Sequence, residues 1–269
     1  MDKKYTKNYS LSKEEMNGML KRFSYANSTT TDKGSKIFEA SSTTDDVYTH
    51  DDKELDDKTN DEQRKTNDAC QSCCELSIIS LSTDEQFKCA FRKCREVFCD
   101  KLLDYGASWR IMRPQSVTDQ IYIKANRIRS IEESNGVTMV NEGVLPEFIG
   151  IVNYGIIGLI QLVRGYSKDG TDMSTKEVLD LYEKYATISF ELMQKKNHDY
   201  DEAWRMMRIC SYTDLILMKI CRTKSIESNN GKTKVSEGID ANYLDMINYA
   251  IFGIIKLLEE EESVNDEKK

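Results

Sequence analysis

The chain has 269 residues, of which 46 are acidic and 38 basic, and this gives a net charge of −8. The pI near 5.1 argues against a surface that binds DNA or RNA polymers, because such a surface needs clustered Lys and Arg in excess. It does not argue against a pocket for a single nucleotide. Only two prolines and 13 glycines, with plentiful Lys, Glu, Leu and Ile, favour helices.

The N-terminal part of the chain differs in composition from the rest. Residues 27–60 are rich in Ser, Thr, Asp and Lys, and residues 45–62 hold nine acidic side chains against two lysines. Such a segment buries too little apolar surface to offset the entropy lost on ordering it. We therefore predict a disordered polar and acidic tail over residues 1–78, with a short helix at Ser12–Phe23. The tail is either a solvated extension or a regulatory, partner-binding segment.

Apolar stretches and cysteines bear on the compartment. The start of the chain shows no apolar secretory signal, so we expect a cytoplasmic protein. The most apolar stretch, Phe148–Val163, is shorter than the roughly 20 residues that cross a bilayer, and it predicts a buried helix and no membrane contact. Cys70, Cys73 and Cys74 resemble half of a zinc site without a second half, so we expect the cysteines to be reduced and mostly buried.

Helical patterns dominate after about Leu76. The first predicted helix starts at Ser82 or Thr83, with Glu85 as capping partner. The second starts at Thr118-Asp119 and ends near Asn135-Gly136. The third runs from Leu145 to Arg164, with Pro146 in its first turn. The same order then returns, with predicted starts at Ser174-Thr175, at Thr213-Asp214 and at Asp240, the last helix ending at Glu262.

This return is a literal internal repeat. Residues 104–162 align with residues 199–257 at a constant offset of 95, and 27 of the 59 aligned residues are identical. The second copy carries three extra residues before Asn197. We predict an all-α fold of two tandem helical modules, 79–167 and 168–262, related by a pseudo-twofold axis, with a disordered C-terminus at 263–269. The protein is then a monomer with an internal pseudo-dimer, or a homodimer.

The kind of residue retained between the copies is informative. Apolar positions have drifted between similar side chains, as a core tolerates when its volume is kept. Many retained residues are charged, amide or aromatic, which hydrophobic packing alone does not require. We infer that these residues have a polar role in both copies, either functional or structural.

In the second copy, part of this polar set is predicted to converge. Lys219 and Arg222 lie three apart on one helix, and Asp245, Asn248 and Tyr249 share a face of the next. If the two helices are antiparallel, the cations face the carboxylate, amide and phenol. The cations suit phosphate oxygens, and Asp245 with Glu237 suits Mg²⁺. The alternative is a buried ion-pair network that ties the helices together.

A second cluster surrounds the aromatic residues 200 and 204. Tyr200 and Trp204 lie four apart, so on one helix they share a face and offer a ring to a base, or they form the edge of the core. Arg205 follows as a further phosphate-binding candidate, and Asp199 is either part of the site or an N-cap. His198 has Leu103 at the equivalent position, so we do not expect it to be a catalytic base.

These residues resemble the nucleotide modification associated domain 1 family. The resemblance rests on Lys-Asn-x-Asp-Tyr-x-x-Ala-Trp, on Lys219-x-x-Arg222, and on Glu237 with Asp245-x-x-Asn248-Tyr249. It implies an all-helical fold and a role in nucleotide metabolism or modification. The family is similar in style to MazG-type enzymes, which use helix-borne carboxylates and Mg²⁺ to release pyrophosphate from nucleoside triphosphates.

The copies differ where that chemistry would reside, because Gly150 takes the place of Asp245. The second copy is therefore the better candidate, with Lys124 and Arg127 of the first completing the pocket. The MazG-like Glu-Glu-x-x-Glu is missing before Asp199. We predict that the protein binds a nucleotide and, as the more specific form of this hypothesis, that it is a Mg²⁺-dependent nucleoside triphosphate pyrophosphohydrolase. The alternative is a non-catalytic helical scaffold or partner-binding module whose polar network is structural.

Overall fold

The structure is a computed structural model that describes residues 77–134, 136, 142–233 and 237–266. Within these residues the fold is all-helical, as predicted. Its long helices are α3 (Thr83–Tyr105), α4 (Pro114–Glu133), α5 (Leu145–Arg164), α6 (Thr175–Tyr200), α7 (Ile209–Ser228) and α8 (Ile239–Asp266). Short 3-10 helices are η2 (Ile78–Ser80), η3 (Ser108–Ile111) and η4 (Ala203–Met206). The predicted tail, apart from its last two residues, and Cys70, Cys73 and Cys74 lie outside the described residues.

Capping signals in the sequence locate several helix starts. Ser82 precedes α3 and Ser174 precedes α6, and in each case the hydroxyl accepts from the backbone N–H three residues on. The carboxylates of Glu85 and Glu177 accept in return from the backbone N–H of the serine, both at 2.9 Å. These reciprocal bonds satisfy N–H groups that a helix start leaves free. The bounds of α5 are those predicted.

Two predicted helix starts and one predicted helix end are wrong. α4 starts at Pro114 and α7 at Ile209, about one turn before the predicted starts at Thr118 and Thr213. Proline is accommodated in a first turn, and the two threonines lie inside their helices, where their hydroxyls reach across to the other copy. α8 continues to Asp266, so residues 263–266 of the predicted disordered C-terminus are helical. The glutamates that precede them are good helix formers.

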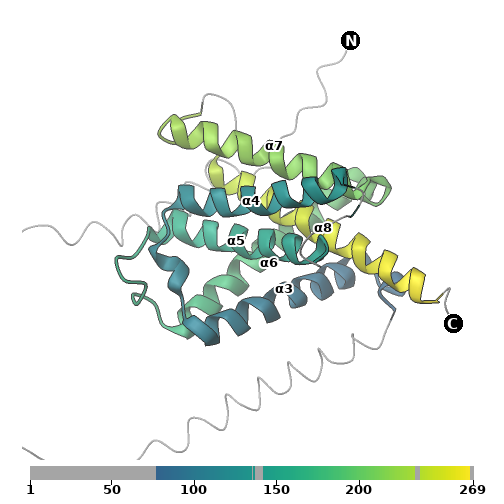
Figure 1. Cartoon of the computed structure of the whole chain (residues 1–269), viewed down its shortest axis with the longest axis horizontal. Helices are drawn as coiled ribbons and strands as arrows, with labels where there is room; N and C mark the ends of the chain where they lie inside the picture. The colour runs from purple at the N-terminus through teal and green to yellow at the C-terminus, as the bar shows by residue number, and fades with distance from the viewer. Residues whose placement is uncertain (1–76, 135, 137–141, 234–236, 267–269) are drawn as a thin grey trace, which may run out of the picture. The chain divides into compact units, whose positions relative to one another are not determined.

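α5 and α8 form the centre of the bundle and pack against the other long helices (Figure 1). Side chains of α5 such as Phe148, Ile151 and Ile156 are fully buried, which confirms the predicted buried helix. By length and composition, α5 is also the one helix in the described part that meets the criteria for a membrane span, although most of its residues are buried inside the bundle.

Contacts between α5 and α8 are reciprocal. A Cβ atom on Gly158 would lie 2.7 Å from the ring of Tyr243, and a Cβ atom on Gly253 would lie 3.0 Å from the ring of Phe148. Gly158 and Gly253 are equivalent positions of the repeat, as are Phe148 and Tyr243. Each copy therefore packs an aromatic ring on the glycine of the other, as in an isologous interface.

The contact between α4 and α7 has the same symmetry. Thr118 Oγ1 donates to Glu227 at 2.7 Å, and Thr213 Oγ1 donates to Glu132 at 2.8 Å. The ion pairs beside them repeat the pattern and join Lys224 to Asp119 and Arg129 to Asp214. Because each interaction recurs after exchange of the two copies, the predicted pseudo-twofold arrangement is confirmed.

A first prediction concerns Glu132 and Glu227. Burial raises the pKa of both carboxyls above the ordinary value of 4.5, more than the threonine hydrogen bonds lower it. The folded state therefore holds these protons more tightly than the unfolded chain, and this stabilisation is lost as pH rises through the raised pKa values. In the double variant Glu132→Gln and Glu227→Gln we expect the Tm to fall less than in the wild type between pH 4.5 and 7.

The measurement is thermal unfolding followed by circular dichroism across this pH range. Glu96→Gln, at an exposed position on α3, is the control and should follow the wild-type curve. Parallel curves for the double variant and the wild type would contradict the prediction.

Candidate functional site

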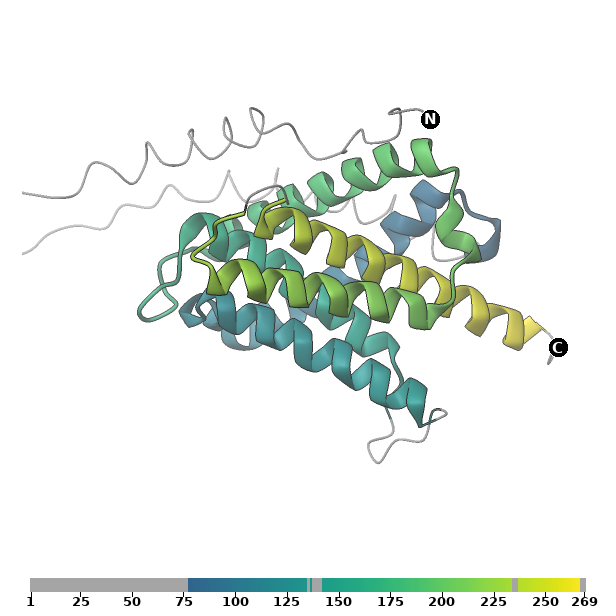
Figure 2. The same ribbon diagram turned by 90° about the horizontal axis from the view of Figure 1, so that it is seen from above.

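The predicted cation–carboxylate cluster of the second copy forms where α7 and α8 lie side by side (Figure 2). The two helices are antiparallel. The ammonium of Lys219 lies 2.5 Å from Asp245 Oδ2 and 3.9 Å from Glu237 Oε2. The other oxygen of Asp245 accepts from Lys196, which reaches in from α6. The cluster thus joins three helices and the segment before α8.

Burial is uneven within this cluster. The side chains of Lys219 and Asp245 are 8% and 7% exposed, whereas Lys196 and Glu237 are about one third exposed. The inner ion pair is therefore shielded from solvent, where an ion pair persists only if its partners satisfy one another. Lys196 and Glu237 lie on the side of the cluster that faces solvent.

Arg222 differs from the other cations of the cluster in its lack of a described partner. Its guanidinium is half-buried, and it makes no hydrogen bond or ion pair with any residue that the structure describes. It nevertheless lies close to the others. Burial and the charges of Asp245 and Glu237 raise the pKa of Tyr249 to about 12, and the positive charge of Arg222 opposes this shift. Lys196, Lys219 and Arg222 therefore face only two carboxylates.

The equivalent cluster of the first copy is closed. Glu147, with a side chain 6% exposed, accepts from both Lys124 and Arg127. Arg127 also lies 3.2 Å from Glu142. Two cations thus meet two carboxylates, and each cation is paired. Gly150, at the position of Asp245, lies directly beneath the Lys124 side chain, which an added Cβ would overlap.

Asn248 and its equivalent Asn153 link helices. Asn153 accepts from the Tyr182 hydroxyl and donates to the Cys94 carbonyl, both at 2.9 Å. Asn248 accepts from Ser189 at 2.6 Å, while its buried Nδ2 has no hydrogen-bond partner in the described part of the chain. The amides therefore tie α3 and α6 to the central helices, which is a structural role.

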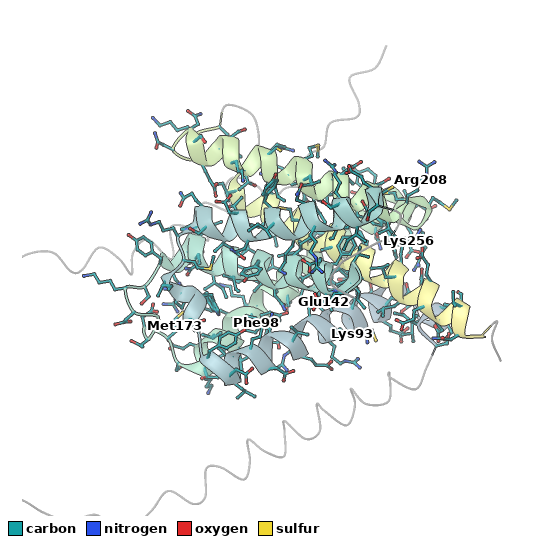
Figure 3. The ribbon with its side chains drawn as sticks, viewed as in Figure 1. Lys93, Phe98, Glu142, Met173, Arg208 and Lys256 are labelled. Carbon is teal, nitrogen blue, oxygen red and sulfur yellow. The ribbon has the colours of Figure 1, made fainter. Side chains whose placement is uncertain are left out.

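Trp204 and Arg205 lie in a different cluster. The buried Trp204 ring stacks on Phe252 at 4.4 Å, with the Arg205 guanidinium 4.4 Å over it. Arg205 also donates to Glu202 at 2.6 Å. Lys256, labelled in Figure 3 at the same end of the bundle as Arg208, donates to the carbonyls of residues 205 and 207. This arrangement favours the core-edge interpretation of Trp204.

The first copy repeats that arrangement with different partners. Arg110 is 1% exposed and binds Asp172 through two nitrogens, at 3.2 and 2.8 Å. Gln161, equivalent to Lys256, donates to the carbonyl of Arg110 at 3.1 Å. The Trp-Arg pair is therefore retained at a turn that both copies need for packing.

Two local predictions around Asp199 are wrong. Tyr200 and Trp204 do not share a helical face, because α6 ends at Tyr200 and residues 201 and 202 have positive φ angles of 48° and 53°. Asp199 lies in the last turn of α6 and is not an N-cap. It contacts the exposed His198, whose Nδ1 is 3.2 Å from its Oδ1.

The cysteines are less buried than expected. The structure describes five free cysteines, of which Cys94 is buried, Cys89 and Cys99 are half-buried, and Cys210 and Cys221 are exposed.

The predicted Mg²⁺ ligands do not form a preformed metal site. No group of three or more His, Cys, Asp or Glu side chains suited to a metal lies within the described residues. Moreover, the Lys219 ammonium lies between Glu237 and Asp245, at the position that a metal ion bound by both carboxylates would take. Mg²⁺ would have to displace Lys219 to bind both carboxylates.

Sequence reasoning did not single out Lys196 as a site residue. The repeat contained a signal for Lys196, because Lys101 stands at the same offset of 95, just before the region of constant alignment. Lys101 is exposed, since the first copy has a glycine where Lys196 finds its carboxylate.

Comparison with known proteins agrees with the repeat. The family model of nucleotide modification associated domain 1 matches residues 101–162 and again residues 196–257. The family model thus matches the chain twice. Each match runs from the last turns of α3 or α6 to the central helix of its copy, and the two are separated by the offset of 95. Searches of curated proteins and of solved structures gave no significant match.

The second copy contains a buried ion pair, Lys219 with Asp245, on which a second prediction rests. Asp245→Asn should lower the free energy of unfolding by about 3 kcal/mol, because two ammonium groups lose their shared carboxylate inside the protein. Glu147→Gln should have a similar effect in the first copy. For a domain of this size the Tm should fall by roughly 6–12 °C.

Thermal unfolding of both variants checks this expectation. Asp180→Asn, which changes an exposed carboxylate on α6, is the matched control and should leave the Tm unchanged. A Tm within about 1 °C of wild type for Asp245→Asn would show that the ion pair contributes no stability.

Proposed function

We propose that the protein binds a nucleotide, and that the second copy holds its phosphate groups with Arg222, Lys219 and Lys196. The observation that carries this proposal is the difference between two equivalent arginines. Arg127 is neutralised by Glu142 and Glu147, whereas Arg222 is half-buried without a described partner. A desolvated guanidinium without a counter-ion favours an anionic ligand.

Phosphate suits this arrangement chemically. Arginine presents a planar fork of donors that matches two phosphate oxygens, and charge-assisted hydrogen bonds of this kind are among the strong ones. Lys196 and Lys219 are balanced in charge by Asp245 and Glu237, so Arg222 gives the cluster its net positive charge. The donors of Arg222 bind no residue that the structure describes. A role in nucleotide binding also agrees with the family model that matches the chain twice.

The first copy supports the other interpretation for its own residues. Lys124 and Arg127 are paired with carboxylates, so we infer that this network is structural and stabilises the position of α4 against α5. The scaffold alternative thus applies to one copy and the binding site to the other.

Arg222 provides the sharpest test. Arg222→Ala should weaken binding of a deoxynucleoside triphosphate at least tenfold in isothermal titration calorimetry, because donors to a charged ligand are lost. Its Tm should stay at the wild-type value, since no described ion pair is broken. The equivalent change Arg127→Ala should lower the Tm and affect affinity less. Equal affinity of Arg222→Ala and wild type would contradict the proposal.

Dependence on Mg²⁺ separates binding from the proposed pyrophosphohydrolase activity. Since the proposed phosphate ligands are cationic side chains, affinity for a deoxynucleoside triphosphate should be retained in EDTA. Calorimetry in EDTA and in MgCl₂ measures this, and a parallel assay follows pyrophosphate release. Binding that disappears in EDTA would instead favour Glu237 and Asp245 as metal ligands.

A further inference from the structure

An exposed aromatic ring stands next to the proposed phosphate site. Tyr200, the last residue of α6, is 65% exposed. A large ring exposed to this extent gains little from the fold. Trp204, the other aromatic residue of this segment, is only 6% exposed and stacks on Phe252. Of the two, Tyr200 has the free ring surface.

Two observations connect Tyr200 with the cluster. On α6 it lies one turn after Lys196, on the same face, and the Lys196 ammonium binds Asp245. Its neighbour on α8 is Tyr249, which lies one turn after Asp245. The Tyr249 hydroxyl interacts electrostatically with Tyr200 and with Arg222. The exposed ring and the Arg222 guanidinium therefore both lie near the same half-buried tyrosine.

We propose that Tyr200 is the residue on which the base of the bound nucleotide stacks while Arg222 and the two lysines hold its phosphates. This inference rests on the proposed function and extends it from phosphate recognition to base recognition. Stacking on an aromatic ring tolerates every base, because each base has a π-face. The site then prefers a nucleotide to inorganic polyphosphate without selecting strongly among bases.

The repeat supplies a matched control. Tyr105 is equivalent to Tyr200, is 56% exposed, and lies beside the half-buried Tyr154 as Tyr200 lies beside Tyr249. The cations next to this pair, Lys124 and Arg127, are neutralised. The two copies thus present the same pair of rings, once beside Arg222, which has no ion-pair partner in the described part of the chain, and once beside two paired cations.

The experiment titrates the full chain with dATP, dTTP and tripolyphosphate by isothermal titration calorimetry. Tyr200→Ala should weaken binding of dATP and dTTP about tenfold or more, because a base–aromatic stack is lost, and should leave the affinity for tripolyphosphate unchanged. Tyr200→Phe should retain wild-type affinity for all three ligands, since stacking needs the ring and not the hydroxyl. Tyr105→Ala should also bind them as the wild type does.

The outcomes distinguish the two proposals. If tripolyphosphate and the nucleotides bind with equal affinity, or if Tyr200→Ala leaves dATP affinity unchanged, base stacking is overturned while phosphate binding stands. If tripolyphosphate affinity falls together with that of the nucleotides in Tyr200→Ala, the residue acts by positioning the phosphate site, and base stacking is again overturned. If none of the three ligands binds the wild type, both proposals fail.

Discussion

The reciprocal packing of an aromatic ring on a glycine is the contact on which the rest of the structure depends. Phe148 lies against Gly253 and Tyr243 against Gly158, so α5 and α8 approach closely at two equivalent points. An added methyl group at either glycine would overlap a ring that is itself fully buried. Because α5 is apolar around most of its surface, it must be covered, and α8 of the other copy covers it together with α4, α3 and α6. This contact sets where α4 and α7 lie, and hence where every polar cluster forms.

Most polar residues retained between the copies have a structural reason. The Thr–Glu bonds between α4 and α7 recur with the pseudo-twofold symmetry. Asn153 and Asn248, and likewise Arg110 and Arg205, are hydrogen-bonded in both copies, although through different partners. Buried donors and acceptors resist substitution because leaving one partner unpaired costs free energy. Retention in a repeat is therefore weak evidence of a ligand. The informative positions are those where the geometry is retained and the partner is lost.

The sequence predicted much of this architecture because the relevant signals are local or repeated. Capping pairs, hydrophobic period and the offset of 95 located the helices and the pseudo-twofold axis, and helical spacing brought Lys219 to Asp245. It left open whether Trp204 forms the edge of the core or faces a base, because that depends on Phe252, 48 residues away. The contribution of Lys196 likewise requires the crossing of α6 and α8, which only tertiary packing determines.

The difference between the two clusters follows from the position of one carboxylate. Glu147 aligns with Asn242, and the carboxylate of the second copy lies three residues later, at Asp245, on the same face but about one turn further along. In the first copy the carboxylate meets Lys124 and Arg127, whereas in the second it meets Lys219 and is shared with Lys196. Among the described residues, the cation left without a partner is the arginine. Since the guanidinium is the side chain best shaped for phosphate, this displacement is the basis of the phosphate site that we propose.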